Sequence, residues 1–117
     1  MIEHEIAEFG RRLGIAHLEF NEQDLISLHV ADVGDIFLEK KGETLFLTLA
    51  EEGEAGAAAY EKLLRIINWR RLPQLVVTAG IAKGRRMLVT RMEAEKATAA
   101  GLENALRLLM QIMKTAV

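Results

Sequence analysis

Apolar residues in this 117-residue chain repeatedly change their spacing, and this alternation constrains the fold more than any other feature. Residues 1–13, 56–69 and 98–116 repeat apolar side chains every three or four positions, as amphipathic helices do. Residues 15–50 and 75–92 instead alternate apolar with polar positions, as half-buried strands do. Because the strands come in groups and do not alternate with helices, the order predicts an α+β fold with a mainly antiparallel sheet of about six strands.

Three hairpins are expected within these segments. The first joins residues 15–20 to residues 26–30, which pairs Leu18 with Leu28 and places His17 opposite His29.

The second hairpin turns at Lys41-Gly42, pairing Leu38 with Leu45 and Phe37 with Phe46. The third turns at Lys83-Gly84 and pairs Val77 with Thr90. Leu72-Pro73 ends the middle helix, and Thr98 caps the last helix.

Composition limits the classes of protein to consider. The length suits a single domain spanning residues 1–117, and half of the residues are hydrophobic. A net charge of −2 argues against nucleic acid as a partner. The chain has neither a basic, apolar leader nor an apolar run of the ~18 residues that a bilayer requires, so we expect no membrane insertion.

Catalytic signatures are missing from the sequence. Cysteine is absent, and the lone Ser27 lies outside any Gly-x-Ser-x-Gly turn. Residues 80–84 resemble a phosphate loop only superficially, since they lack its Gly-Lys-Ser/Thr ending and run into a strand. We therefore expect no enzymatic activity and no cofactor.

One small group of residues has metal-ligand character. The first hairpin would bring His17, Glu19 and His29 onto one sheet face, where two imidazoles and a carboxylate could hold zinc. The alternative is that all three are polar residues on a solvated or partner-covered face.

The three helices carry more apolar surface than one small sheet can cover. Wide apolar faces around a sheet indicate a homodimer, a bound segment of another protein, or both.

The succession of motifs resembles the class I type III secretion chaperones of the Tir-chaperone type. The resemblance rests on segments that follow one another in the family's order and cover nearly the whole chain: Phe9-Gly10-Arg11-Arg12-Leu13-Gly14-Ile15, Leu18-Glu19-Phe20-Asn21-Glu22, Leu25-Ile26-Ser27-Leu28-His29-Val30, Ile36-Phe37-Leu38-Glu39, Leu63-Leu64-Arg65-Ile66-Ile67-Asn68 and the closing helix from Leu102 to Met113. Each motif is a pattern of apolar positions, so their common order carries the resemblance.

The resemblance implies a homodimeric chaperone of the bacterial cytoplasm. Such a protein binds the N-terminal region of a secreted effector as an extended segment. It keeps the effector soluble and export-competent without hydrolysing ATP, and presents it to the export apparatus with its ATPase.

The resemblance also assigns residues to two surfaces. The effector-binding candidates are Ile2, Ile6, Phe9, Phe37 and Phe46, and the dimer candidates are Leu63, Ile66, Ile67, Trp69, Leu75 and Val77. Some of these residues must instead belong to the core.

Two other functions are compatible with the sequence. One is a dimeric regulatory or scaffolding domain of the same fold outside secretion, and the other is a small metal- or ligand-binding enzyme that uses His17, Glu19 and His29.

Overall fold

The computed structural model describes residues 2–53, 56–69 and 76–116, with the side chains of residues 68 and 69 excepted. The elements run in the order α1 (Ile2–Arg12), β1 (Leu25–Val30), β2 (Gly34–Lys41), β3 (Thr44–Glu51), α2 (Ala57–Trp69), β4 (Val77–Ala82), β5 (Arg85–Glu93), the 3-10 turn η1 (Ala94–Lys96) and α3 (Ala99–Thr115).

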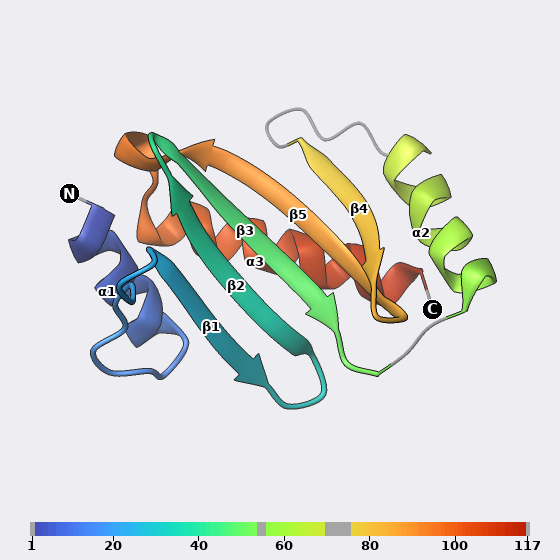
Figure 1. Ribbon diagram of the computed structural model, residues 1–117, viewed down its shortest axis with the longest axis horizontal. Helices are drawn as coiled ribbons and strands as arrows, with labels where there is room; N and C mark the ends of the chain where they lie inside the picture. The colour runs from blue at the N-terminus through green and yellow to red at the C-terminus, as the bar shows by residue number, and fades with distance from the viewer. Residues whose placement is uncertain (1, 54–55, 70–75, 117) are drawn as a thin grey trace.

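The strands form one sheet in the order β1-β2-β3-β5-β4, and every neighbouring pair is antiparallel. Helix α3 crosses behind the sheet, α1 lies at one end, and α2 lies beside β4 (Figure 1). The predicted α+β class with an antiparallel sheet is therefore confirmed. Strands β1 and β4 are the two edges of the sheet.

One face of the sheet forms the core with the helices. Along β2 and β3 the buried and half-buried positions alternate, so every second side chain points toward α3. Leu38, Leu47 and Leu88 from three adjacent strands are fully buried, as are Leu102 and Leu109 of α3. The other face of the sheet carries no helix in the described part of the chain (Figure 1).

The predicted hairpins have different outcomes. The third hairpin is confirmed, because Val77 pairs with Thr90 and the turn at Lys83-Gly84 has positive φ at both residues. The second hairpin exists, but its register is shifted. Leu38 pairs with Leu47, because Lys41 pairs with Thr44 and the two loop residues lie one position later than predicted.

The first predicted hairpin is wrong. Residues 13–24 form no strand, and residues 25–30 pair with β2 across a short turn. The sheet described here thus has five strands. The helix predictions are confirmed to within a residue, and the Thr98 hydroxyl caps α3 by accepting a hydrogen bond from Gly101 N. The predicted helix stop at Leu72-Pro73 lies outside the described residues.

A buried arginine joins four elements at the end of the sheet where α3 finishes. Arg86 of β5 donates hydrogen bonds from Nε and Nη2 to the carboxylate of Glu51 at the end of β3. Its Nη1 lies 2.9 Å from the carbonyl oxygens of Ala59 in α2 and Ala116 after α3. The carbonyls at the C-terminal end of a helix lack partners within the helix, and the bond to Ala116 satisfies one of these carbonyls at the end of α3. The bond to Ala59 fixes α2 against the sheet.

Candidate functional site

Helix α1 packs one face into the core and leaves the other beside a groove. Ile6 and Phe9 are fully buried, whereas Ile2 is half-buried. Glu5 Oε1 accepts a hydrogen bond from Ala99 N at 2.9 Å, which fixes α1 to the start of α3. The effector-binding candidates Ile6 and Phe9 thus belong to the core of this chain, and their side chains leave no surface for a partner.

The segment after α1 packs tightly on this helix. A Cβ atom placed on Gly10 would lie 2.6 Å from Leu18 Cβ, so the close approach requires glycine. Leu18 is buried, and the Asn21 side chain accepts hydrogen bonds from the N–H groups of Gln23 and Leu25. This side-chain turn leads the chain into β1.

Between α1, this segment and the β2–β3 turn are two adjoining hollows, which we call the α1 groove. The first has a volume of about 400 Å³ and the second about 470 Å³. Both are lined by Glu3 of α1 and Lys40 of β2. Ile2, Phe20 and Ala94 contribute apolar surface. Sequence reasoning missed the contribution of residues 17–24, because it assigned part of them to a strand.

Carboxylates dominate the polar lining of the α1 groove. The acidic side chains are Glu3, Glu19, Asp24, Glu43 and Glu95. Within the described ranges none of them forms an ion pair. Lys40 and His17 are the basic side chains of the lining. The described lining of the groove therefore combines apolar surface with an excess of carboxylates over basic side chains.

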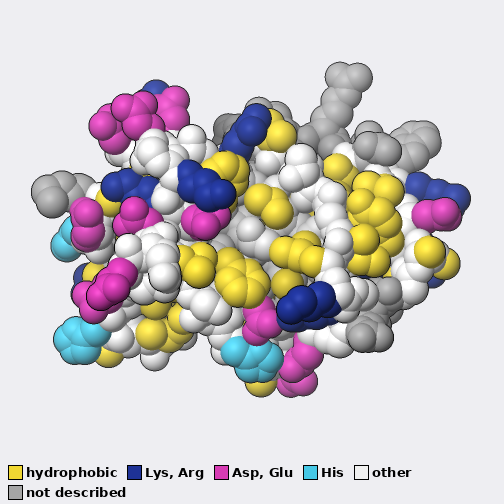
Figure 2. Space-filling model, viewed as in Figure 1, with side chains coloured by type: hydrophobic (Ala, Val, Ile, Leu, Met, Phe, Trp, Pro, Cys, Tyr) yellow, Lys and Arg dark blue, Asp and Glu magenta, His cyan; other side chains and the backbone are white. Residues whose placement is uncertain are grey.

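The open face of the sheet is a second candidate surface. Phe37 of β2 and Phe46 of β3 are half-buried there. Phe37 pairs with Thr48 and Phe46 with Glu39, which are successive cross-strand pairs on this face. Thr48, the partner of Phe37, also pairs with Val89 of β5, so these three residues lie side by side across the sheet. Figure 2 shows hydrophobic side chains gathered over the middle of this face. Both phenylalanines lie where a partner could contact them.

Among the described residues, the large hydrophobic side chains that are most exposed lie in the edge strand β4 or just before it. Val76, just before β4, is 61% exposed, and Ile81 within β4 is 46% exposed. Ile66 and Ile67 of the neighbouring α2 are half-buried.

The dimer candidates divide into three groups. Leu63 and Val77 are buried in the core of this chain and offer no surface to a second copy. Ile66 and Ile67 keep part of their surface exposed. The side chain of Trp69 and all of Leu75 lie outside the described residues.

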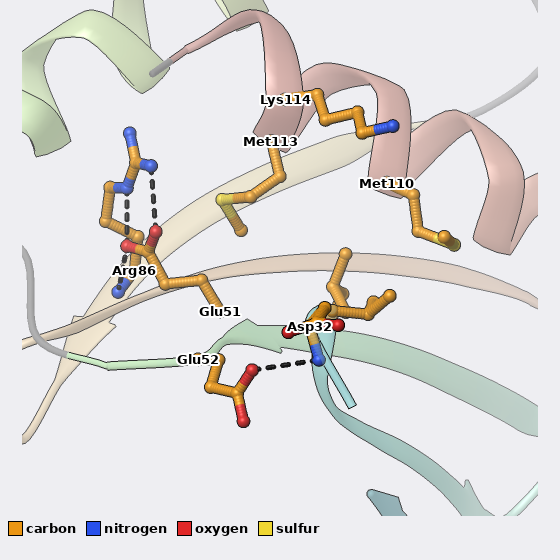
Figure 3. A pocket seen from close by; sticks show the side chains of 9 residues that line it. Asp32, Glu51, Glu52, Arg86, Met110, Met113 and Lys114 are labelled. Carbon is orange, nitrogen blue, oxygen red and sulfur yellow. Dashed lines mark hydrogen bonds and ion pairs between the residues drawn. The ribbon is translucent and has the colours of Figure 1, made fainter. Parts of the chain in front are cut away.

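A third hollow, of about 200 Å³, lies beside the C-terminal part of α3. Met110 and Met113 form its apolar side, and Asp32, Glu52 and Lys114 are polar residues in its lining (Figure 3). Glu52 Oε2 accepts a hydrogen bond from Asp32 N at 3.0 Å, which holds the β1–β2 turn against the end of β3.

The three proposed metal ligands do not form one site. His17 and Glu19 both line the first hollow of the α1 groove, whereas His29 of β1 is paired with Asp35 of β2. His29 Nδ1 is 2.8 Å from Asp35 Oδ1, and Arg85 Nη2 is 2.8 Å from Asp35 Oδ2. Hydrogen bonds from His29 and then Arg85 hold the pKa of Asp35 below its usual value. No cluster of three potential metal ligands occurs among the described residues.

Open sheet edges, an apolar sheet face and an acidic groove are features of a domain that binds other polypeptides. The chain belongs to the Tir chaperone protein (CesT) family, whose model matches residues 4–116. A search of curated proteins found no significant match.

Solved structures with the same fold include chains from two protein complexes. The Yersinia pestis type III secretion chaperone SycH, in complex with a stable fragment of YscM2, is 16% identical, with full coverage of both chains and a TM-score of 0.77. A chain of the ExsC–ExsE complex is 21% identical, with 97% of this chain and 89% of that chain covered and the same TM-score.

A third solved structure has lower similarity. YbjN, a putative transcription regulator from E. coli, is 11% identical, with 94% and 84% of the two chains covered and a TM-score of 0.55. These likenesses establish the fold, and the family match identifies the chain as a chaperone of the type III secretion kind. Within the described residues, no helix is both long and apolar enough to cross a membrane.

Proposed function

We propose that this chain binds the N-terminal region of a secreted effector as an extended segment and keeps it soluble and export-competent. The family match over residues 4–116 is the observation that carries the proposal. We further propose that the chain acts in the bacterial cytoplasm, has no enzymatic activity, and passes the effector to the ATPase of the export apparatus without hydrolysing ATP itself.

The edge of the sheet offers a binding surface for an extended segment. An edge strand has backbone N–H and C=O groups that can pair with an added strand. Strand β1 is such an edge, and Asp24 of the α1 groove immediately precedes it. Alternate side chains of an added segment would then extend the open face of the sheet, on which Phe37 of β2 and Phe46 of β3 lie two and three strands away.

Co-purification tests this function directly. The tagged chain, expressed in its native host, should retain a secreted protein through that protein's N-terminal region, and limited proteolysis should leave this region protected. Retention of the effector after deletion of its N-terminal region would contradict the proposal. A purified complex that hydrolyses ATP would contradict the non-enzymatic part of it.

We also propose that two copies associate through β4 and α2. The support is the exposure of Val76 and Ile81 at the sheet edge, together with the half-buried Ile66 and Ile67. Large exposed hydrophobic residues at an unpaired edge favour association with a second copy. Light scattering coupled to size exclusion should give about twice the 13.1 kDa of one chain, and a monomer at micromolar concentration would contradict the dimer.

A further inference from the structure

We infer that the α1 groove accepts a positively charged segment of the effector, with lysine or arginine side chains between its apolar ones. This inference rests on the proposed function and adds the chemical character of the bound segment.

The first step is the local imbalance of charge. The whole chain has 17 acidic and 15 basic side chains, so its overall charge selects no partner strongly. The lining of the groove, in contrast, contains five carboxylates against one lysine and one histidine. Such a concentration of one sign creates a local potential that attracts the opposite charge.

The second step is that these carboxylates have no partners of their own in the described structure. Several acidic side chains elsewhere are paired, such as Glu51 with Arg86 and Asp35 with Arg85. Glu3, Glu43 and Glu95 line the second hollow of the groove without an ion pair within the described ranges. All three side chains are exposed, so a bound cation could reach them without displacing an internal contact.

The third step is the apolar part of the lining. Half-buried Ile2 and Phe20 lie in the same groove as the carboxylates, with buried Ile6 and Leu18 beneath them. A small cation alone would gain nothing from this surface. A segment that alternates apolar and basic side chains would use both components, because apolar burial supplies affinity and charge complementarity supplies specificity.

Two designed probes test the inference. Both are short fluorescent peptides with leucine at the same alternating positions, and they differ only in having lysine or glutamate at intervening positions. Anisotropy titrations should show that the lysine peptide binds more tightly, with an affinity that falls between roughly 50 and 500 mM NaCl because salt screens exposed charges. Equal affinity for the two peptides, or no binding of either, would overturn the inference.

Matched variants locate the binding to the groove. The test variant is Glu3→Gln/Glu43→Gln/Glu95→Gln, and the control variant is Glu52→Gln/Glu61→Gln/Glu103→Gln, whose positions lie outside the groove. Both variants change the net charge by the same amount. The groove variant should bind the lysine peptide ~10-fold more weakly, as expected for three exposed ion pairs, and the control should bind it nearly as well as the parent chain. Equal effects of the two variants would overturn the inference.

The two proposals fail in different ways. If the chain retains an effector in the co-purification but the groove variant retains it as well as the control does, the charge inference is wrong and the chaperone function stands. If no effector is retained while the lysine peptide still binds the groove, the proposed function is wrong and the charge preference stands. Thermal unfolding followed by circular dichroism verifies that both variants are folded.

Discussion

Arg86 and Glu51 form a two-point ion pair in which Arg86 Nη2 lies 2.8 Å from Glu51 Oε1 and Nε contacts Oε2. The arginine side chain is 4% exposed and the glutamate side chain 16%. A buried pair of this kind adds little net stability compared with an apolar pair, but removal of one partner leaves the other charge buried and unpaired.

Glu51→Gln should therefore lower the free energy of unfolding by about 3 kcal/mol, because Arg86 would keep its charge in a buried site. Urea denaturation at neutral pH measures the change. Glu61→Gln, on the exposed side of α2, is the control and should stay within about 0.5 kcal/mol of the parent chain. Equal stability of the two variants would show that Arg86 needs no charged partner.

Acid should destabilise the protein through the same carboxylate. The hydrogen bond from Arg86 holds the pKa of Glu51 below its usual value of 4.5. The unfolded chain therefore binds more protons at acidic pH, so the stabilisation is fully present above about pH 4.5 and is lost as pH falls through the lower, folded pKa. Urea denaturation at several pH values should show a steeper fall in the parent chain than in Glu51→Gln.

Gly10→Ala should destabilise the packing of the segment after α1. The new methyl group would lie 2.6 Å from Leu18 Cβ, a contact that the backbone must move to relieve. We expect a loss of about 2 kcal/mol in the free energy of unfolding. Gly56→Ala is the control, since a Cβ atom there meets nothing within 4 Å. If both variants unfold at the same urea concentration, the close packing of Gly10 on Leu18 is not required.

Ile81→Asp should prevent dimer formation and leave the fold of each chain intact. The side chain is 46% exposed in the single chain, so a carboxylate is tolerated there, but burial against a second copy would leave it desolvated and unpaired. Light scattering should report about 13.1 kDa. The control Ala100→Asp, at an exposed position of α3, should remain dimeric. An unchanged dimer in Ile81→Asp would exclude this part of β4 from the interface.

Phe46→Ser should weaken effector capture by about 10-fold, since loss of an aromatic contact at the centre of an interface is costly. Quantitative pull-down of the co-purified effector measures the effect. Leu108→Ser is the matched control, because Leu108 is also half-buried but lies on α3, behind the sheet. An equal loss in both variants would mean that capture follows overall stability and not the open sheet face.

Local sequence patterns predicted most of the fold. The three helices have clear apolar periodicity, and the glycine of Lys83-Gly84 permits the positive φ that the third hairpin turn requires. The second hairpin shows the limit of this reasoning. The alternation in β2 and β3 is satisfied equally well by two registers that differ by two residues, because such a shift keeps every side chain on its own face.

Residues 15–20 were mispredicted because their alternating pattern has another physical origin. Leu18 is buried because it packs on Gly10 of α1, and the Asn21 side chain forms the turn that a strand assignment overlooked. Tertiary contact here overrides the local pattern. The candidate site was predicted less well for the same reason. A single sequence does not distinguish an apolar residue that faces the core, such as Phe9, from one that faces a partner, such as Phe46.

The sheet order places β1 and β4 at opposite edges. If two copies associate through β4, the α1 grooves of the two copies lie at the ends of the dimer that are farthest from the contact. An effector segment long enough to reach from one groove to the other would be bound at two points, and engagement of the first would raise the effective concentration at the second. Weak individual contacts could then hold an effector firmly, yet release it stepwise as the export machinery pulls one end of the segment away.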